Sequence, residues 1–236
     1  MKKVSIIIPV FNEAQALATH LPLLQGLREL GHEIIVVDGS GDAASAARCA
    51  QLLDRWLVSE PGRARQMNAG AASASGEIFV FLHIDTRLPD DAMELLQEGF
   101  ARDSTLWGRF DVRLSGRRWA FRVIECMINL RSRVSGVATG DQAIFVRRSV
   151  FENIGGYDAL PLMEDVAISK TLRKRARPLC LRSKVITSSR RWEAHGVVRT
   201  VLLMWWIRLL YSLGVSPQTL HGMYVKKARE VDESKE

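Results

Sequence analysis

Apolar and amphipathic segments alternate along the first part of the chain. Short runs rich in β-branched and aromatic residues predict buried strands at residues 4–10, 34–37 and 79–85, and residues 55–58 predict a further short strand. The segments between them have helical composition or spacing, at residues 12–31, 43–53 and 62–75. Strands that alternate with helices predict an α/β fold, with a parallel sheet covered on both faces.

The second half of the chain is less regular. It contains three further strand patterns, at residues 107–114, 143–146 and 179–187. Helical patterns cover residues 117–134, 163–174 and the strongly apolar segment 197–213, and residues 190–196 look like a loop. Because no repeat or low-complexity linker interrupts the chain, we expect one domain over residues 1–215. It divides into 1–100, 101–196 and a C-terminal helix at 197–215, and a tail follows at 216–236.

The net charge indicates the class of binding partner, and the cysteine content indicates the cellular compartment. The net charge is +7, which favours an anionic partner such as nucleic acid, a nucleotide-linked substrate or a membrane surface. The three cysteines form no CxxC pair, so a zinc site and a disulfide framework are not expected, and reduced cytosolic thiols fit best. The apolar run after Lys3 is interrupted by Asn12-Glu13 with no cleavage site, and we interpret it as a core strand rather than a signal peptide.

Two aspartates stand where predicted strands end. Asp85 follows the apolar run 79–84, and Asp38 follows 34–37. Ligands of open parallel sheets bind beyond the carboxyl ends of the strands, so both carboxylates stand where a metal or substrate would be held. The alternative for each is an aspartate that caps the following helix. Two such residues on neighbouring strands favour a binding site.

Two nucleotide-binding motifs were weighed against this interpretation. Gly39-Ser40-Gly41 with Ala44 matches the dinucleotide fingerprint G-x-G-x-x-A. Asp38 would place a negative charge beside the pyrophosphate, however, and the first strand–helix turn has no glycine. The chain also has no GxxxxGK[ST] motif, which argues against an ATPase.

A series of short motifs resembles glycosyltransferase family 2, whose members have the GT-A fold. In chain order the motifs are Pro9-Val10-Phe11-Asn12-Glu13, Val36-Val37-Asp38-Gly39-Ser40, Arg63 with Asn68 and Gly70, His83-Ile84-Asp85, Gly140-Asp141-Gln142, Glu164-Asp165 and Arg191-Trp192. Each motif is weak alone, but seven in order over residues 4–196 are specific. The stretch 188–196 is also similar to a small bacterial subgroup associated with arsenosugar biosynthesis.

The resemblance implies a fold and a division of labour. It implies an α/β GT-A (Rossmann-like) fold, with a mostly parallel central sheet, helices on both faces and a C-terminal apolar or amphipathic helix. Residues 1–100 would then bind the nucleotide sugar, and residues 101–196 would bind the acceptor and carry the catalytic group.

The resemblance also implies roles for individual residues. Asp165 would be the catalytic base of an inverting transfer, with Glu164 raising its proton affinity. Asp85 would bind Mg²⁺ or Mn²⁺, with His195 as a further ligand. Donor-binding residues would be Pro9, Phe11, Asn12, Glu13, Asp38, Gly39, Arg63, Asn68 and Ile84. Acceptor-binding residues would be Gly140, Asp141, Gln142, Glu164, Arg191 and Trp192. The alternatives are a solvated helix start at Glu164-Asp165 and a loop histidine at position 195.

Two departures from the family pattern bear on the substrate. His83 replaces the first aspartate of Asp-x-Asp, so no nucleotide contact is assigned to it. Ser188 replaces the glutamine of Gln-x-x-Arg-Trp, which holds the growing chain in processive synthases. The sequence therefore favours a single transfer to a small or lipid-linked acceptor.

The resulting hypothesis is an inverting, metal-dependent glycosyltransferase that uses a nucleotide diphosphosugar. A basic nucleic-acid-binding protein is one alternative. The arginines are spread among apolar helical positions, however, so nucleic acid is not the expected partner. The other alternative is a non-catalytic relative that only binds the nucleotide sugar. The presence of Asp85 and Asp165 argues against this alternative.

The C-terminal helix leaves the cellular location open. Residues 201–215 are too few for a membrane span, which takes about 20 residues. Trp205, Trp206 and Tyr211 suit a membrane interface, where Arg199 and Arg208 would meet anionic lipid. A core helix or a homodimer contact is the alternative. We expect a cytoplasmic protein, and a peripheral contact with the inner face of the membrane stays open.

Overall fold

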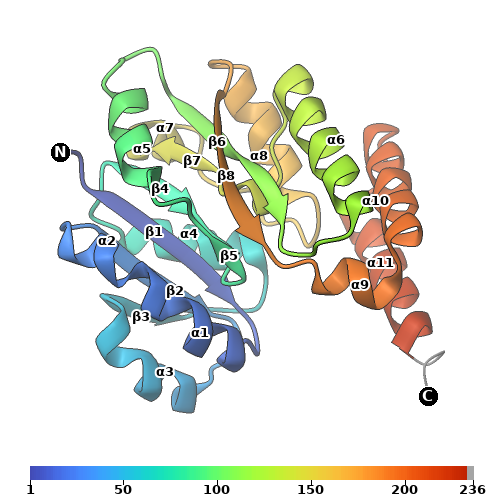
Figure 1. The fold of residues 1–236 in the computed structure, drawn as a ribbon, viewed down its shortest axis with the longest axis horizontal. Coiled ribbons are helices and arrows are strands. Elements are labelled where there is room, and N and C mark those ends of the chain that lie inside the picture. Colours follow the sequence, from blue (N-terminus) through green and yellow to red (C-terminus); the bar gives the residue numbers. More distant parts are fainter. Residues whose placement is uncertain (233–236) are drawn as a thin grey trace.

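An eight-stranded sheet runs through the centre of the protein, in the order β3-β2-β1-β4-β7-β6-β8-β5 (Figure 1). This computed structural model describes residues 1–232, without the side chains at 191, 194, 195, 197, 198 and 225–232. The strands are β1 (Val4–Val10), β2 (Glu33–Asp38), β3 (Arg55–Val58), β4 (Ile78–Phe81), β5 (Thr86–Arg87), β6 (Trp107–Leu114), β7 (Phe145–Arg147) and β8 (Leu179–Thr187).

Helices and 3₁₀ turns connect these strands. The helices are α1 (Ala14–His20), α2 (Gln25–Glu29), α3 (Ala43–Cys49), α4 (Arg63–Ser73), α5 (Ala92–Phe100), α6 (Trp119–Ser135), α7 (Arg148–Asn153), α8 (Glu164–Arg173), α9 (Arg190–His195), α10 (Val197–Ser212) and α11 (Pro217–Asp232). The 3₁₀ turns are η1 (Leu21–Leu24), η2 (Ala50–Leu52) and η3 (Gly140–Gln142).

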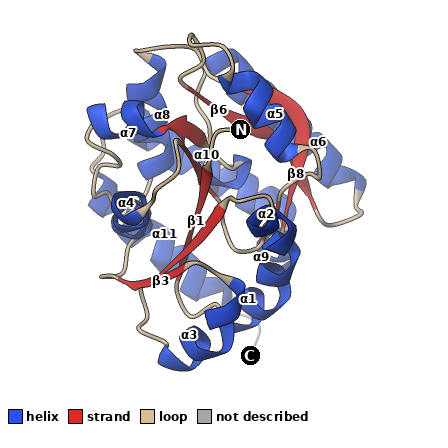
Figure 2. Ribbon diagram, turned by 90° about the vertical axis from the view of Figure 1, so that its left-hand side faces the viewer, coloured by secondary structure: helices blue, strands red, loops and turns tan. Residues whose placement is uncertain are grey.

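The first half of the sheet is parallel, as the sequence predicts. β1 pairs in parallel with β2 and β4, and β2 pairs in parallel with β3. All residues of β1 and β2 are buried, because helices cover both faces. Figure 2 shows this layering, with α4 and α7 on one side of the strands and α2 and α5 on the other.

The second half of the sheet is mixed. β7 lies between β4 and β6 and is antiparallel to both, while β6 and β8 are parallel and β5 is antiparallel to β8. The expected mostly parallel arrangement therefore holds for the first half only. The chain reaches β7 from the η3 turn, beside the end of β4, so β7 runs back along β4 in the opposite direction.

Two apolar layers sandwich the sheet. Side chains alternate between the faces of a strand, so Ile6 and Ile8 face one layer and Ile7 faces the other. The first layer receives Leu17 and Leu21 from the first helical segment, and Leu96 and Phe100 from α5. The second receives Ala64, Met67 and Ala71 from α4, Phe151 from α7, and Ile168 and Leu172 from α8.

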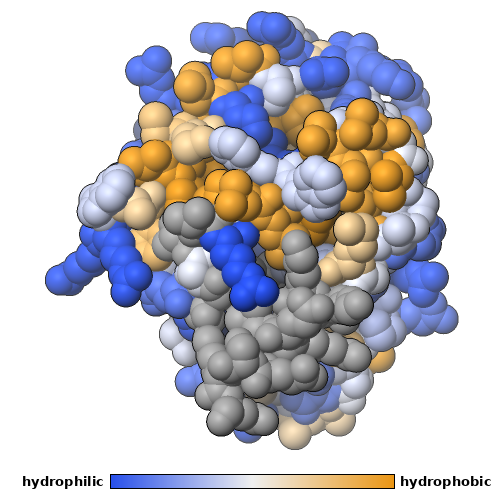
Figure 3. All heavy atoms as spheres, turned by 90° about the vertical axis from the view of Figure 1, so that its right-hand side faces the viewer, coloured by the Kyte–Doolittle hydropathy of each residue, from blue (hydrophilic) through white to orange (hydrophobic). Residues whose placement is uncertain are grey.

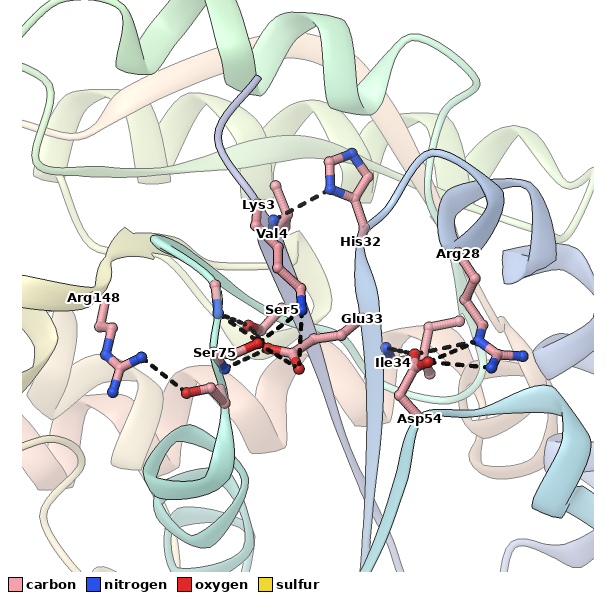
Figure 4. A network of polar contacts seen from close by, with 12 residues as sticks. Lys3, Val4, Ser5, Arg28, His32, Glu33, Ile34, Asp54, Ser75 and Arg148 are labelled. Carbon is pink, nitrogen blue, oxygen red and sulfur yellow. Dashed lines mark hydrogen bonds and ion pairs between the residues drawn. The ribbon is translucent and has the colours of Figure 1, made fainter.

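A buried carboxylate anchors the amino-terminal end of the parallel strands (Figure 4). Glu33 at the start of β2 accepts hydrogen bonds from the Ser5 hydroxyl at 2.5 Å and the Gly76 amide at 3.0 Å. Burial raises the pKa of Glu33, but hydrogen bonds from Ser5 and Ser75 outweigh it, and the pKa lies below its ordinary value. Polar contacts therefore fix this end of the sheet.

The C-terminal region differs from the sequence-based expectation at two places. Residues 190–196, expected as a loop, contain α9, and the expected tail at 216–236 contains α11. α11 packs against α10 through Leu220, which lies in one cluster with Ile207 of α10 and Val166 of α8. The mixed acidic and basic residues from Lys226 onward had predicted a frayed tail. Among residues 1–232, no helix is long and apolar enough to cross a membrane.

Candidate active site

A tight turn follows β4 and presents Asp85. β4 ends at Phe81, earlier than the predicted 79–85, and the Thr86 amide donates to the His83 carbonyl at 3.0 Å. Asp85 is half-buried, and its single hydrogen bond to the described part of the chain comes from the Thr86 hydroxyl at 3.4 Å. Its carboxylate therefore keeps most of its capacity to coordinate a cation. Ile84, which lies between His83 and Asp85, is buried in the core, so its side chain is not at the surface of the site.

His83 lies directly against Gly140. A Cβ atom at Gly140 would come within 2.6 Å of His83 Nε2, so a larger residue at position 140 would displace the imidazole. Gly140 begins the η3 turn, which Thr139 and Gln142 close through a capping box. Two motifs that are far apart in the sequence are thus in contact.

Asp165 joins the same cluster from α8. Its Oδ2 accepts a hydrogen bond from the Gly140 amide at 3.0 Å, and its Oδ1 accepts one from the Val166 amide at 2.7 Å. α8 begins after Met163, which has a left-handed φ of +68°. The carboxylate lies in the first turn of the helix, where the helix dipole stabilises negative charge.

Glu164, beside Asp165, has the perturbed carboxyl group. Burial and the negative charge of Asp165 raise the pKa of Glu164 to about 7, against a smaller opposing effect of Arg63. The repulsion between these two neighbouring carboxylates, expected from the sequence, thus raises the pKa of Glu164. Burial, Asp165 and Glu164 also raise the pKa of Tyr157, a buried residue that the sequence analysis did not single out.

Asp38 organises the loop after β2. The side chain is buried, and its Oδ1 accepts hydrogen bonds from the Ser40 amide at 2.7 Å and the Ser40 hydroxyl at 2.5 Å. Its Oδ2 accepts one from the Asp42 amide at 2.7 Å. Asp42 in turn caps α3 by accepting from the Ser45 amide. The residue that caps α3 is therefore Asp42, whereas Asp38 orders the loop before the helix.

The loops that follow β1 and β2 are joined by hydrogen bonds and form one lip at the edge of the candidate site. Pro9 is buried within β1, whereas Phe11 and Asn12 are exposed beyond it and Glu13 is half-buried. The Asn12 amide donates to the Ser40 hydroxyl at 3.4 Å, and the Gly39 amide donates to the Val10 carbonyl at 3.0 Å. The predicted donor-binding residues of these two loops therefore lie together.

Gln66 on α4 joins the ends of β1 and β2 through hydrogen bonds. The sequence patterns did not identify it as a residue of the site. Its amide nitrogen donates to the Val10 carbonyl at 2.6 Å and to the Val37 carbonyl at 2.8 Å. The side chain is only 3% exposed, so these contacts are shielded from water. The sequence offered one signal for Gln66. It is a polar residue beside Met67 and near Gly70, on the face of the helical segment that packs against the sheet.

Two predicted donor-binding residues on α4 have different surroundings. Arg63 is exposed in the first turn of α4, close enough to Glu164 to lower its pKa. Asn68 instead binds the Tyr157 backbone, donating to its carbonyl at 2.8 Å and accepting from its amide at 2.9 Å. In this structure Asn68 holds the 155–157 turn in place.

The predicted acceptor-binding residues are only partly brought together. Gln142 is buried, and its side-chain oxygen accepts from the Thr139 amide at 3.2 Å, so it supports the η3 turn. Trp192 is half-buried against the cluster that contains Phe121. The side chains of Arg191 and His195 lie outside the described residues.

Unpaired charged atoms lie behind Asp165. Asp141 Oδ1, Arg131 Nη2 and Arg208 Nε are each shielded from solvent, with no hydrogen-bond partner in the part of the chain that the structure describes. Burial is the largest effect that raises the pKa of Asp141, and burial also lowers the pKa of Arg131 to about 10. The expectation that Arg208 meets lipid does not fit the burial of its Nε beside α6.

Asp85 is the ligand that the described side chains offer to the cation expected from the resemblance. Among described residues, no group of three or more His, Cys, Asp and Glu side chains could enclose a metal ion. Mg²⁺ is often bound by one or two carboxylates together with substrate phosphates rather than by a full protein cage. The accessible carboxylate of Asp85 fits that mode.

Comparisons with known proteins agree with this fold. The family model "Glycosyl transferase family 2" matches residues 5–155. An uncharacterized glycosyltransferase of Mycobacterium tuberculosis is 36% identical over 167 residues, which cover 66% of this chain and 62% of that protein. An undecaprenyl-phosphate 4-deoxy-4-formamido-L-arabinose transferase of Salmonella choleraesuis is 26% identical over 62% of this chain and 48% of that protein. The chain thus spans less than two thirds of these relatives.

Solved structures share the architecture at low sequence identity. TarS from S. aureus superposes with a TM-score of 0.62 at 17% identity, covering 79% of this chain and 60% of that one. A mannosyltransferase from Pyrobaculum calidifontis, in complex with GDP-Man and Mn²⁺, gives a TM-score of 0.60 at 20% identity, covering 78% and 56%. The expected GT-A α/β fold is therefore confirmed. With a family model that matches most of its length, the chain belongs to glycosyltransferase family 2.

Proposed function

We propose that the protein transfers a sugar from a nucleotide diphosphosugar to an acceptor hydroxyl, with inversion and with a divalent cation. The contact chain from the Asp85 turn through His83 and Gly140 to Asp165 carries this proposal. It brings a carboxylate suited to a cation and a carboxylate suited to a proton to the same end of the sheet.

The residues divide the chemistry between them. Asp165 accepts the proton of the acceptor hydroxyl as its oxygen attacks the anomeric carbon from the face opposite the leaving nucleoside diphosphate. The exposed guanidinium of Arg63 is suited to pair with the diphosphate. Mg²⁺ or Mn²⁺, held by Asp85 and diphosphate oxygens, would neutralise charge on the leaving group. Asp38, Gly39, Asn12 and Phe11 line the side where the nucleoside would lie.

Relatives support the substrate classes. Solved neighbours are complexes with UDP-GlcNAc and with GDP-Man and Mn²⁺. One curated relative is named for an undecaprenyl-phosphate acceptor. We therefore propose a nucleotide diphosphosugar donor and a small or lipid-linked acceptor for this chain.

An apolar surface on α6 and α10 supports work at a membrane. Its members are exposed large apolar side chains at helical spacing: Trp119, Val123, Met127, Leu130 and Val134 on α6, Leu202, Trp205, Trp206 and Leu209 on α10, and Leu213 directly after α10. Figure 3 looks at this side, where a broad apolar area is bordered by hydrophilic side chains. Exposed Arg117 and Arg118 lie directly before α6, and exposed Arg199 lies in the first turn of α10. We propose that this surface rests on anionic lipid at the inner face of the membrane of a cytoplasmic protein.

The test is a transfer assay coupled to a binding screen. UDP-, GDP- and dTDP-sugars are compared by thermal shift with and without Mn²⁺, and the donor that stabilises the protein is then offered with soluble and lipid-linked acceptors. A metal-dependent shift with one nucleotide, and a product of inverted anomeric configuration, are the expected results. If no nucleotide sugar binds with or without Mn²⁺, the proposed function is wrong.

A further inference from the structure

A basic cavity lies between the C-terminal ends of α6 and α8. Its volume is about 600 Å³, and it is lined by residues 133–136, by Arg173 and by residues 177–180. Figure 1 shows these two helix ends at the top of the molecule, whereas Asp165 lies in the first turn of α8. Arg173 lies at the other end of this helix, a rise of about 12 Å from Asp165. The cavity is therefore separate from the candidate active site.

Three arginines line the cavity, and the first of them shares its carboxylate. Arg133 donates to both oxygens of Asp111, at 2.9 Å and 2.8 Å. Asp111 is also paired with Arg109, so one carboxylate serves two guanidinium groups. The other two arginines of the lining are Arg173 and Arg177. These five side chains together carry a net positive charge.

Arg173 is held at the cavity by contacts with the end of α6. Gly136 ends this helix with a left-handed φ of +63°. A Cβ atom at Gly136 would lie 2.9 Å from Arg173 Cδ and 3.5 Å from Pro178 Cδ, so the glycine leaves room for the arginine side chain. The Arg173 guanidinium donates to the Ser135 carbonyl. Because a carbonyl is neutral, this contact positions the guanidinium without cancelling its charge.

Basic residues at the end of a helix have an ordinary structural role. Lys170 and Arg173 lie in the last turn of α8, where cations stabilise the helix dipole. That effect is confined to the last turn, and Arg177 lies beyond the end of the helix, followed by Pro178. Moreover, residues 170–184 contain seven Lys and Arg residues and no Asp or Glu. Helix stabilisation therefore does not account for the positive charge of the cavity as a whole.

The size and lining of the cavity indicate a phosphate-bearing ligand. Guanidinium groups are well suited to phosphate, because their planar donor arrays match its oxygens. The volume lies within the range of about 300–1,000 Å³ that small-molecule sites occupy, so the cavity has room for more than a single ion. No aromatic side chain is among the lining residues, so the described lining offers no platform on which the bases of single-stranded nucleic acid would stack.

The apolar surface of α6 and α10 reaches this cavity. Val134 lines the cavity, is 72% exposed and belongs to that apolar surface. Leu130, one turn earlier on α6, is also exposed. Positive charge directly beside an exposed apolar surface suits a ligand that has an anionic head and apolar chains. An anionic membrane lipid has both.

We infer that the basic cavity binds the phosphate head group of an anionic membrane lipid, which is not a substrate of the enzyme. The inference rests on the proposed membrane contact and names the lipid that this contact would select. Arg117 and Arg118, directly before α6, would meet the general surface charge of the membrane at one end of the helix. The cavity would hold an individual head group at the other end, and the two ends together would fix how the protein lies on the membrane.

The experiment measures the binding of a soluble short-chain lipid. The full chain is titrated by calorimetry with dihexanoyl phosphatidylglycerol below its micelle concentration, with dihexanoyl phosphatidylcholine and with glycerol 3-phosphate. We expect one phosphatidylglycerol per chain and weaker binding of the zwitterionic lipid. Arg173→Gln and Arg177→Gln should each lower the affinity for phosphatidylglycerol about tenfold or more, because a charge-assisted contact is lost.

Arg175→Gln is the matched control. Arg175 is exposed in the same segment but does not line the cavity, so its variant removes the same charge and should keep the wild-type affinity. Val134→Ser should weaken phosphatidylglycerol binding and leave glycerol 3-phosphate unaffected, because only the lipid places a chain on the apolar surface. The Tm of each variant without lipid checks folding, and Arg177→Gln should keep the wild-type Tm because Arg177 is exposed.

Three results would overturn the inference. The first is that phosphatidylglycerol does not bind. The second is equal affinity for glycerol 3-phosphate and phosphatidylglycerol, which would assign the cavity to a soluble phosphate. The third is an equal loss in Arg175→Gln and Arg177→Gln, which would show general charge attraction, and binding of a single-stranded oligonucleotide would then assign the surface to nucleic acid.

Parallel measurements on the wild type keep the proposed function separate from this inference. Thermal shifts with nucleotide sugars report on the donor site, and co-sedimentation with anionic vesicles reports on the membrane contact. A protein that passes both tests but does not bind phosphatidylglycerol refutes the lipid cavity alone.

Discussion

The Gly140 amide donates a hydrogen bond to the Asp165 carboxylate at 3.0 Å, across 25 residues of sequence. The contact fixes one carboxylate oxygen beside the turn that His83 also touches. A catalytic base needs this kind of positioning, because its effect depends on reaching the acceptor hydroxyl at hydrogen-bond distance.

Replacement of Asp165 tests its role as the base. Asp165→Asn keeps an oxygen for the Gly140 amide, so we expect a folded protein with nearly unchanged nucleotide-sugar affinity. Turnover should fall by about 100-fold or more, since general base catalysis contributes that much. Steady-state kinetics alongside calorimetry provide the check, and a wild-type transfer rate in this variant would remove the assignment.

Glu164 makes folding stability depend on pH. Its folded pKa of about 7 lies above the ordinary value of 4.5, so the protonated form is favoured in the folded protein. The contribution of Glu164 to stability is therefore fully present below pH 4.5 and is lost as the pH rises through about 7. Glu164→Gln should flatten the decrease in Tm between these values. Glu98→Gln, at an exposed position of α5, is the control and should keep the wild-type slope.

Asp85 is expected to be required for the cation. Asp85→Ala should weaken both Mn²⁺ and nucleotide-sugar binding, because the cation links the protein to the diphosphate. Asp90→Ala is a suitable comparison, since Asp90 is exposed and pairs with Arg87. Titration calorimetry that finds equal affinities in Asp85→Ala and the wild type would contradict the assignment.

Gln66 is expected to act on the donor site without touching the donor. Gln66→Ala leaves the buried Val10 and Val37 carbonyls without their side-chain donor, which costs about 1–3 kcal/mol of folding free energy. The lip formed by β1 and β2 should loosen, so we expect a lower donor affinity with little change in turnover at saturation. Urea unfolding and donor titration measure the two effects, and an unchanged midpoint would show that the hydrogen bonds contribute nothing.

The apolar surface of α6 and α10 is tested with vesicles. The protein should co-sediment with anionic liposomes, and Trp119→Ser and Trp205→Ser should each release a larger fraction into the supernatant. Leu23→Ser is the control, since Leu23 is also exposed but belongs to η1. If the wild type stays in the supernatant and light scattering reports a dimer, the surface joins two copies of the chain instead.

Strands were the most predictable part of the fold. The runs 4–10 and 107–114 match the bounds of β1 and β6, because burial leaves a direct mark in the sequence. The run 55–58 matches β3, although this edge strand is exposed at both of its ends. β7 was expected at 143–146, but its antiparallel place between β4 and β6 depends on contacts that no local pattern records.

Local motifs in the sequence marked where three carboxylates of the proposed site stand. Asp38, Asp85 and Asp165 stand at strand or helix ends that the sequence marks. The basic cavity was not identified, because it forms only where two helices that are distant in sequence lie side by side. Gln66 and Tyr157 were missed for a similar reason: their roles depend on backbone and charges contributed by other segments.

The strand order has a consequence for how a growing chain acquires this structure. The four strands β3-β2-β1-β4 are complete once residue 81 has been made, and they need no later strand for their pairing. The edge of β4 that pairs with β7 stays unpaired until β7, which begins at Phe145, has been synthesised. During this interval a nascent chain presents an unpaired strand edge, the kind of edge that recruits foreign strands. Ribosome-bound chains of intermediate length are therefore the stage at which we expect this protein to depend most on chaperones.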